Sequence, residues 1–429
     1  MPAPEVQESK NHEFYYKKNE LYCENVPVRK IIKKLGTPTY IYSYKTFTEH
    51  LAKLQRAFRS AKPLICYSVK ANSNLAVLRA LVKKGAGLDI VSGGELYRAK
   101  KAKCQGRKIV YAGVGKTEAE IREAIRSRIL LFNVESIPEL EQINAIAKKM
   151  RKKVNVSLRV NPNVDPHTHD FITTGKAENK FGIDFEKARE IFLSAKDPKR
   201  FSHAQVSGIH VHIGSQIETG DPFVEAFQKI LGFIDELEAE GIKIKFLNLG
   251  GGLGAIYSDE NPQTAEEFAR KVLPLFKKRK FQIIFEPGRF IAANSGILAM
   301  KVIYVKQTNV KSFAIVDAGM NDFIRPAFYN AYHHFWPVTK KDDAKRWVYD
   351  IVGPICESGD FFAKDRELQD VRSGDLLALM TAGAYGFTMS SNYNSRPRAC
   401  EVMVKGASFK VVRKRETYQD LVRGEKASA

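Results

Sequence analysis

The sequence predicts an α/β protein in which a (β/α)8 TIM barrel is followed by a mainly β C-terminal domain. Between about residue 40 and residue 288, short apolar segments alternate with segments whose apolar residues recur every three or four positions. After about residue 288 the pattern changes to short alternating or β-branched segments bounded by Gly, Asp and Pro. The first pattern is typical of parallel strands with crossover helices, and the second of a β-domain.

Eight apolar segments of the first region have the length of buried parallel strands. They are Leu64–Tyr67, Leu88–Val91, Ile109–Ala112, Leu130–Val134, Val154–Val160, Val206–Ile213, Ile244–Leu249 and Gln282–Glu286. Helical periodicity separates them, most clearly in Pro138–Met150, Phe185–Ala195, Pro222–Glu240 and Ala265–Lys278. In a (β/α)8 barrel the chemistry lies where strands end, so the residues that close these segments are the first candidates for a site.

The remaining strands are expected at both ends of the chain. The C-terminal ones are Val302–Gln307, Ser312–Asp317, Trp347–Val352, Leu376–Met380, Glu401–Val404 and Ser408–Arg413, and two more, Glu13–Tyr16 and Glu20–Cys23, precede the barrel. We therefore expect an N-terminal segment (1–38) that packs with the β-domain, a barrel (39–288) and a C-terminal β-domain (289–429).

The composition restricts the classes of function. The chain has 429 residues, a formal net charge of +21 and five widely spaced cysteines, which predicts reduced thiols rather than disulfides or structural zinc. No apolar run approaches membrane-spanning length, and Met1–Lys10 does not resemble a secretion signal, so we expect a cytoplasmic protein with no membrane partner. The basic residues are spread over several predicted helix faces, which favours a solvated surface over nucleic-acid binding.

Lys70 directly follows the first predicted strand, in the segment Tyr67–Asn72. At the end of an inner strand we expect its ammonium to be poorly solvated, which would lower its pKa. A neutral amine can form a Schiff base with an aldehyde, the chemistry that pyridoxal phosphate (PLP) requires. On position alone, an ordinary surface lysine is the more frequent explanation.

His210 and His212 close the sixth predicted strand, and Ser215 follows them. Residues two apart share a strand face, so both imidazoles are expected to point inward. A metal pair is one interpretation, but no third ligand has recognisable spacing, and we predict no metal site. An imidazole stacked on a cofactor ring, with Ser215 on its phosphate, agrees better with the neighbouring loops.

The seventh and eighth predicted strands end in Gly250-Gly251-Gly252 and in Glu286-Pro287-Gly288-Arg289. Glycines allow backbone N–H groups to approach a phosphate, and the loops after these two strands commonly form the phosphate site of such barrels. Glu286 could keep a pyridine nitrogen protonated, and Arg289 offers a bidentate fork for a carboxylate. A flexible turn and a structural ion pair are the alternative explanations.

Cys356 and Glu357 lie in a glycine-bounded loop of the predicted β-domain, Gly353–Asp360. A cysteine beside an acid is a plausible proton donor, and a buried inert thiol is equally compatible with the sequence. His333-His334, in the aromatic stretch Tyr329–Trp336, is interpreted as packing.

Together and in this order, these motifs resemble the alanine-racemase-like (fold III) PLP-dependent decarboxylases over nearly all of residues 12–420. The resemblance implies that Lys70, His212 and Cys356 are catalytic, with Lys70 as the Schiff-base lysine and Cys356 as the general acid. It also implies a set of cofactor-binding residues: Lys70, His212, Ser215, Gly251, Gly252, Glu286, Pro287, Gly288, Arg289 and Tyr385. Asp89 and Glu95, after the second strand, are expected to orient neighbouring groups.

Further stretches concern the substrate. Thr174-Gly175 and Lys180-Phe181-Gly182 look like the barrel loop of the family members that act on diaminopimelate, and Asp322–Tyr329 carries the Arg and Tyr that hold the far end of an amino acid. The resemblance implies conversion of meso-2,6-diaminopimelate to L-lysine and CO2, the last step of lysine biosynthesis. The implied substrate-binding residues are Arg289, Arg325, Tyr329, Glu357 and Tyr385.

The resemblance also implies a homodimer with shared active sites, because in this family the cysteine comes from the partner subunit. Another basic amino-acid decarboxylase, of ornithine, arginine or D-lysine type, is the alternative, and Arg325 and Tyr329 argue against it. A racemase is disfavoured by Glu286, since the racemases place an arginine against the pyridine nitrogen. A non-catalytic relative would not need both Lys70 and Cys356.

Overall fold

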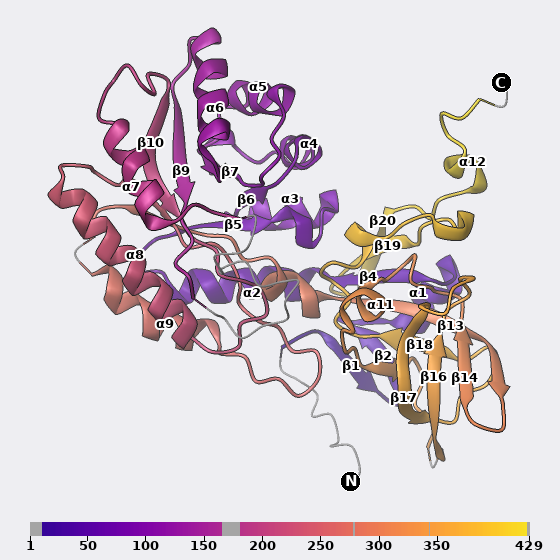
Figure 1. Cartoon of the computed structure of the whole chain (residues 1–429). Helices are drawn as coiled ribbons and strands as arrows, with labels where there is room; N and C mark the ends of the chain where they lie inside the picture. The colour runs from indigo at the N-terminus through magenta and orange to yellow at the C-terminus, as the bar shows by residue number, and fades with distance from the viewer. Residues whose placement is uncertain (1–10, 165–180, 278, 343, 427–429) are drawn as a thin grey trace. The chain divides into compact units, whose positions relative to one another are not determined.

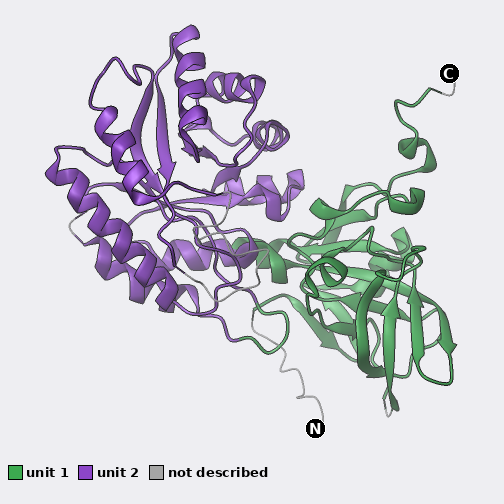
Figure 2. Cartoon of the chain, in the orientation of Figure 1, with its two compact units in different colours: residues 1–48, 256–260, 292–429 green, residues 49–255, 261–291 purple. Residues whose placement is uncertain are grey.

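The computed structural model describes residues 11–164, 181–277, 279–342 and 344–426. It divides into two compact units, shown in different colours in Figure 2. Unit 1 comprises residues 1–48, 256–260 and 292–429, and unit 2 comprises residues 49–255 and 261–291. The domain boundaries expected from the sequence, at residues 38/39 and 288/289, stay a prediction. Within the described residues, no helix has the length and apolar character needed to cross a membrane.

Unit 2 contains a closed barrel of eight parallel strands (Figure 1), which confirms the predicted barrel class. The strands are β5 (Leu64–Ser68), β6 (Gly87–Ile90), β7 (Ile109–Tyr111), β8 (Leu131–Val134), β9 (Val154–Arg159), β10 (Ala204–His210), β11 (Phe246–Asn248) and β12 (Gln282–Phe285). Each pairs in parallel with its neighbours, and β12 closes the barrel against β5. All eight C-terminal ends therefore meet at one rim.

Helices follow the strands on the outside of this barrel (Figure 1). They are α3 (Leu75–Lys83), α4 (Gly93–Lys101), α5 (Glu118–Arg126), α6 (Ile137–Lys149), α7 (Phe185–Ser194), α8 (Asp221–Ala239) and α9 (Ala265–Val272). Most begin at a side-chain cap, in which an Asn, Ser, Thr or Asp accepts a hydrogen bond from the first turn: Asn74, Ser92, Thr117, Ser136, Asp184 and Thr264. The caps fix where each loop ends and thus how long the rim loops are.

The predicted helix Ala265–Lys278 is shorter than expected. The α-helix α9 ends at Val272 and a 3-10 turn, Leu273–Phe276, follows. Pro274 explains the difference, because proline lacks the N–H that would continue the hydrogen bonding of the α-helix.

Unit 1 is mainly β, as predicted. A nine-stranded sheet joins β4 (Thr39–Ser43), β13 (Gly296–Gln307), β14 (Ser312–Val316), β15 (Phe335–Pro337), β16 (Arg346–Val352), β17 (Phe361–Gln369), β18 (Leu376–Leu379), β19 (Cys400–Lys405) and β20 (Ser408–Arg413). A small sheet contains β1 (Phe14–Lys17), β2 (Glu20–Cys23) and β3 (Val26–Pro27). The short helices of this unit are α1 (Val28–Leu35), α11 (Arg325–Tyr329) and α12 (Tyr418–Leu421), and α2 (Tyr44–Ala57) runs from unit 1 into unit 2.

The strand β4 was not expected from the sequence. It lies within the range 39–288 that the sequence assigns to the barrel, yet it pairs antiparallel with β13 and parallel with β19 of unit 1. All five of its residues are buried, which is the pattern of a central strand rather than an edge. Residues 39–43, which the sequence assigned to the barrel, therefore form a strand in the β-sheet of unit 1.

Candidate active site

Glu286 is a buried acidic group on the barrel rim with three side-chain partners. It follows β12, is buried, and receives hydrogen bonds at Oε1 from the amides of Asn133 (3.0 Å) and Asn248 (2.5 Å). Its Oε2 lies 3.2 Å from Nε2 of His210. These partners come from β8, β11 and β10, so three strands of the barrel fix one carboxylate.

Burial opposes ionisation of Glu286, but the contacts with His210 and Asn248 and the charge of Lys70 outweigh it and lower the pKa of Glu286 to about 2. Asp89, at the end of β6, behaves in the opposite way. Burial and the negative charge of Glu286 raise the pKa of Asp89 well above its ordinary value. The environment therefore shifts the pKa values of these two neighbouring carboxyl groups in opposite directions, that of Glu286 downward and that of Asp89 upward.

Lys70 differs from the expectation. The sequence predicted a buried, poorly solvated amine, but Lys70 is exposed, so that prediction is wrong. The strand β5 ends at Ser68, and a 3-10 turn, Val69–Ala71, carries Lys70 beyond the strand end. Its positive charge nevertheless acts on the rim acids: it opposes the upward shift that burial and Glu286 give to the pKa of Asp89. The amine thus belongs to the carboxyl cluster without being buried in it.

Glu95, the other acid expected to orient this region, accepts a hydrogen bond from the backbone N–H of Val91 (2.8 Å). Burial raises the pKa of Glu95, and the nearby Lys70 acts in the opposite direction. Ser68 links the cluster together, because its hydroxyl oxygen lies within hydrogen-bond distance of both the carboxyl group of Asp89 (2.7 Å) and the carbonyl oxygen of Glu286 (3.0 Å).

His210 and His212 have different surroundings. The strand β10 ends at His210, so His212 lies past the strand and is half-buried, whereas His210 is fully buried against Glu286. The N–H of Gly251 donates to Nδ1 of His212 (3.2 Å), which leaves the ring proton on Nε2. Burial, with the charges of Arg159 and Lys70, lowers the pKa of His212 well below its ordinary value. A neutral, fixed imidazole is suited to stacking.

The turn formed by Gly250, Gly251 and Gly252 requires glycine because neighbouring backbone atoms leave no room for a Cβ at these positions. A Cβ on Gly250 would lie 2.5 Å from the carbonyl oxygen of Val211, and one on Gly251 would lie 2.3 Å from that of Glu286. Gly252 has a φ of +115°, a conformation that residues with side chains rarely adopt. The turn brings the loops after β10, β11 and β12 into backbone contact, which also places Gly251 on His212.

Arg289 and Ser215 form a polar pair on the same rim. Arg289 is the first residue of the short helix α10 (Arg289–Ala292), is buried, and donates from Nε to the hydroxyl of Ser215 (3.0 Å). The carbonyl of Pro287 accepts from the N–H of Ser68 (3.1 Å), and that of Gly288 from Ile291 (3.2 Å). The segment 286–289 is therefore tied both to β5 and to the loop after β10.

A buried ion pair on this rim, between Arg159 and Glu135, was not anticipated. Arg159, at the end of β9, donates to both oxygens of Glu135 (3.1 Å each), and its guanidinium stacks on Phe181 at 4.7 Å. The N–H of Gly182 also donates to Glu135 (3.2 Å). Of the loop expected to resemble the diaminopimelate branch, Phe181 and Gly182 are thus anchored to the rim, and Thr174, Gly175 and Lys180 lie outside the described residues.

In unit 1, Cys356 differs from the other four cysteines. It is exposed, whereas Cys23, Cys66, Cys104 and Cys400 are buried. Burial raises the pKa of the Cys104 thiol to about 11 and those of Cys23 and Cys66 well above their ordinary value. Cys356 is therefore the thiol that solvent and small molecules can reach.

The loop that carries Cys356 is held by backbone contacts. The carboxylate of Asp360 accepts from the N–H groups of Ile355 (2.7 Å) and Met320 (2.6 Å), and the side-chain oxygen of Asn394 accepts from the N–H of Cys356 (2.8 Å). Glu357 is exposed beside it. Three chain segments thus fix the position of the thiol.

The remaining substrate-binding candidates also belong to unit 1. Arg325 and Tyr329 are the first and last residues of α11; Arg325 is buried and Tyr329 half-buried. Tyr385, after β18, is half-buried and has a φ of +55°, which is rare for a bulky residue and marks a constrained turn.

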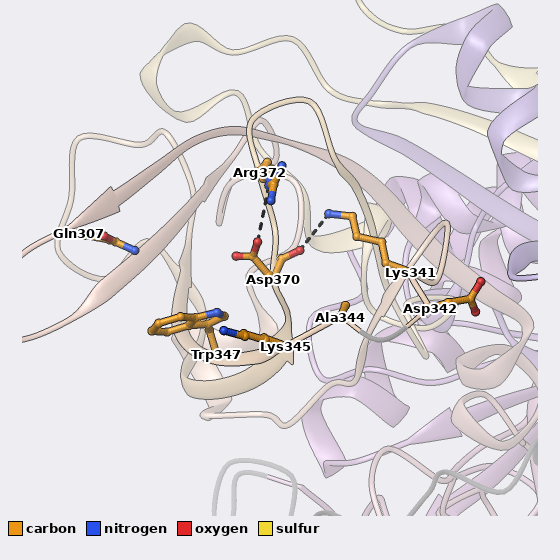
Figure 3. A pocket seen from close by; sticks show the side chains of 8 residues that line it. All are labelled: Gln307, Lys341, Asp342, Ala344, Lys345, Trp347, Asp370 and Arg372. Carbon is orange, nitrogen blue, oxygen red and sulfur yellow. Dashed lines mark hydrogen bonds and ion pairs between the residues drawn. The ribbon is translucent and has the colours of Figure 1, made fainter.

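A cavity of about 520 Å³ in unit 1 (Figure 3) contains none of the candidate residues. It is lined by Gln307, Lys341, Asp342, Ala344, Lys345, Trp347, Asp370 and Arg372. Lys341 is paired with Asp375 (2.6 Å) and Arg372 with Asp370 (3.5 Å), so much of its charge is already compensated by neighbours. We do not assign the chemistry to this cavity.

Sequence reasoning missed Asn133, Asn248 and Arg159 as members of the rim. A signal was present, because each is a polar residue inside or closing an otherwise apolar strand, and each is buried. In the described residues no cluster of three or more His, Cys, Asp or Glu has the arrangement of a metal site. His210, considered as one half of a metal pair, is instead a partner of Glu286.

The rim residues fit PLP. Glu286 is an ionised carboxylate suited to holding a proton on a pyridine nitrogen, and Lys70 supplies an amine in the same cluster. Oδ1 of Asp89 is buried and has no hydrogen-bond partner in the part of the chain that the structure describes. The rim therefore has a polar atom that a bound cofactor can contact. An eight-stranded α/β barrel with this set of groups has the characteristics of the barrel-type PLP-dependent enzymes.

Comparison with known proteins agrees with this class. Residues 44–293 match the family described as pyridoxal-dependent decarboxylase, pyridoxal binding domain. The chain belongs to the family of PLP-dependent diaminopimelate decarboxylases. The diaminopimelate decarboxylase of Aquifex aeolicus is 48% identical over 408 residues, 95% of this chain and 96% of the relative, and that of Vibrio cholerae is 47% identical over 95% and 97%.

A solved structure extends the comparison. The crystal structure of diaminopimelate decarboxylase from Helicobacter pylori complexed with L-lysine is similar with a TM-score of 0.88 at 41% identity, covering 92% of this chain and 98% of that one. The family resemblance that the sequence motifs predicted is thereby confirmed.

Proposed function

We propose that this chain is an enzyme that decarboxylates meso-2,6-diaminopimelate to L-lysine and CO2 with PLP as cofactor, the last step of lysine biosynthesis. The observation that carries the proposal is the ionised, buried Glu286 on a rim that also holds Lys70 and a neutral His212. The similarity to diaminopimelate decarboxylases over almost the whole chain identifies the substrate class.

When bound, PLP supplies an aldehyde that takes up amines and a ring that accepts the electron pair left when CO2 departs. Lys70 would supply the amine that holds the aldehyde, and Glu286 would keep a proton on the ring nitrogen. His212 would lie against the ring face, and Ser215, Gly251, Gly252, Pro287, Gly288, Arg289 and Tyr385 would hold the phosphate and the remaining edge.

The substrate would be gripped away from the reacting carbon by Arg289, Arg325, Tyr329, Glu357 and Tyr385. Such remote binding orients the bond that breaks, so binding energy is used to lower the barrier. Cys356 would then donate the proton that replaces the lost carboxylate on the α-carbon. Its exposure in a loop fixed by Asp360 and Asn394 supports this role.

The test of the activity uses the purified protein with PLP. Borohydride should fix the cofactor onto Lys70, seen by peptide mass, and meso-diaminopimelate should release CO2 with L-lysine as product. L-ornithine, L-arginine and D-lysine are the comparison substrates. Faster turnover of any of these three would contradict the substrate, and absence of a PLP absorption band would contradict the whole proposal.

We also propose a cytoplasmic homodimer with shared active sites. The five unpaired cysteines support a reducing compartment, and the family resemblance supports a site that takes Lys70 from one subunit and Cys356 from its partner. Lys70→Ala and Cys356→Ala proteins should each retain at most about one hundredth of the wild-type activity alone. Mixed under exchange conditions they should recover up to about a quarter of the activity, because half of the dimers would be mixed and each would have one intact site. No recovery after demonstrated exchange would contradict shared sites.

A further inference from the structure

Each ring nitrogen of His333 makes a polar contact although the residue is fully buried. Its Nδ1 lies 2.9 Å from the carbonyl oxygen of Met380, and its Nε2 lies 3.0 Å from a terminal nitrogen of Arg325. A carbonyl can only accept and a guanidinium can only donate. Nδ1 therefore carries the ring proton and Nε2 accepts from Arg325, which defines a neutral imidazole in a single tautomer.

Aromatic rings hold both partners of this hydrogen bond. Tyr257 and Phe323 pack edge-on against the His333 ring, with centroids 5.1 Å and 4.8 Å away. The guanidinium carbon of Arg325 lies over the Tyr257 ring at 4.6 Å, a cation–π distance. All of these residues belong to unit 1. Arg325 is consequently held from two directions, at its edge by His333 and on its face by Tyr257.

We propose that His333 is a positioning residue that orients Arg325 toward the carboxylate at the far end of the substrate. This inference rests on the proposed function, in which Arg325 binds that carboxylate. The neutral imidazole is suited to the task because it fixes the guanidinium without cancelling its positive charge. An aspartate or glutamate in the same place would form an ion pair and weaken the attraction for the substrate.

A packing role alone does not account for the contacts of His333. A phenylalanine would fill the same space between Tyr257 and Phe323, yet it would leave the Met380 carbonyl and the Arg325 N–H without these partners. The polar edges of the ring, rather than its volume, are what position Arg325. The consequence is that His333 contributes to the choice between a substrate with a far carboxylate and one without it.

The experiment compares three substitutions that separate the two ring nitrogens. His333→Phe removes both contacts, His333→Asn keeps a donor near the Met380 carbonyl, and His333→Gln keeps an acceptor near Arg325. We expect KM for meso-diaminopimelate to rise about tenfold in the Phe and Asn variants, the effect of losing one hydrogen bond to a charged group, with kcat changed less than about threefold. The Gln variant should recover most of the affinity.

Ligand binding by calorimetry gives a readout that does not depend on turnover. L-Lysine, the proposed product, retains the far carboxylate, and cadaverine lacks it. His333→Phe should weaken L-lysine binding about tenfold and leave cadaverine binding unchanged. The Arg325→Lys and His333→Phe substitutions should be non-additive for L-lysine affinity, because both remove the same interaction. PLP absorbance and the thermal midpoint monitor folding, and if the Phe variant does not fold, the Asn and Gln pair decides.

The outcomes separate the two hypotheses. Wild-type protein that releases no CO2 from meso-diaminopimelate contradicts the proposed function. An active wild type in which His333→Phe or His333→Asn binds L-lysine normally, or loses L-lysine and cadaverine affinity equally, overturns the positioning role. Fully additive effects of the Arg325 and His333 substitutions would overturn it as well.

Discussion

At the barrel rim of unit 2, Glu286 is buried and its charge is set by amide and imidazole side chains from three strands. In unit 1, Cys356 is exposed and its position is set by backbone hydrogen bonds to Asn394 and by the turn that Asp360 closes. A group that acts as a fixed charge can be enclosed and tuned, whereas a group that delivers a proton must remain accessible. Electrostatics therefore sets the charge of Glu286 in unit 2, whereas loop geometry sets the position of Cys356 in unit 1.

The largest expected effect is that of Glu286→Gln, a substitution that keeps the shape of the side chain but removes its negative charge. We expect kcat to fall about 100- to 1000-fold, the scale of losing one preorganised electrostatic group, while PLP remains bound. Steady-state kinetics and PLP absorbance measure the two effects. Glu286→Asp, which keeps the charge, is the matched control and should retain more activity than the Gln variant. Equal loss in both would show that geometry, not charge, dominates at the rim.

Cys356→Ala tests the exposed side of the comparison. Turnover should fall roughly 100-fold or more because the α-carbon would lack its proton donor, with little change in PLP binding. Cys104→Ala, which changes a buried thiol, is the control and should turn over normally. In the wild type, iodoacetamide should modify Cys356 before the other four cysteines, as peptide mass spectrometry can show. Unchanged turnover in Cys356→Ala would remove the general-acid assignment.

Acid should unfold the protein partly through Glu286. Its folded pKa of about 2 lies below the ordinary glutamate value of about 4.3, so its contribution to stability is complete above the ordinary value. That contribution is lost as the pH falls from about 4.3 toward about 2. The thermal midpoint of the wild type should drop across this range, and Glu286→Gln should show a flatter profile. If the thermal midpoints of the two proteins depended on pH in the same way, buried Glu286 would not be ionised in the folded protein.

The smallest expected change in kcat comes from substitution of Asn394, which tests whether the geometry of the Cys356 loop matters. Asn394→Gly keeps its φ of +54° accessible but removes the oxygen that accepts from the N–H of Cys356. We expect kcat to decrease about fivefold, the scale of one hydrogen bond, with the PLP spectrum unchanged. Asn394→Asp retains an acceptor and should stay close to wild type. A PLP spectrum that changes as much as kcat would argue against a local effect on the cysteine loop.

The sequence predicted much of the barrel and the motifs on its rim, because strand ends can be located from apolar runs and helix caps. It placed Lys70, His212 and Glu286 at strand ends, and in the structure Glu286 directly follows β12 whereas Lys70 and His212 each lie two residues past the ends of β5 and β10. It was wrong about the burial of Lys70, since the 3-10 turn after Ser68 is not evident from an apolar run. It treated His333 as packing, because a histidine among aromatic residues shows nothing of its polar partners.

By itself, the sequence determined the alternation of strands and helices and the order of the chemical groups along the chain, since both follow from local periodicity and residue type. Only the tertiary structure decided which of these groups interact. Asn133, Asn248 and Glu286 are separated by more than a hundred positions at the extremes, and only closure of the barrel brings their side chains together. Because a pKa depends on burial and on the charges nearby, the lowered pKa of Glu286 and the raised pKa of Asp89 arise from that closure.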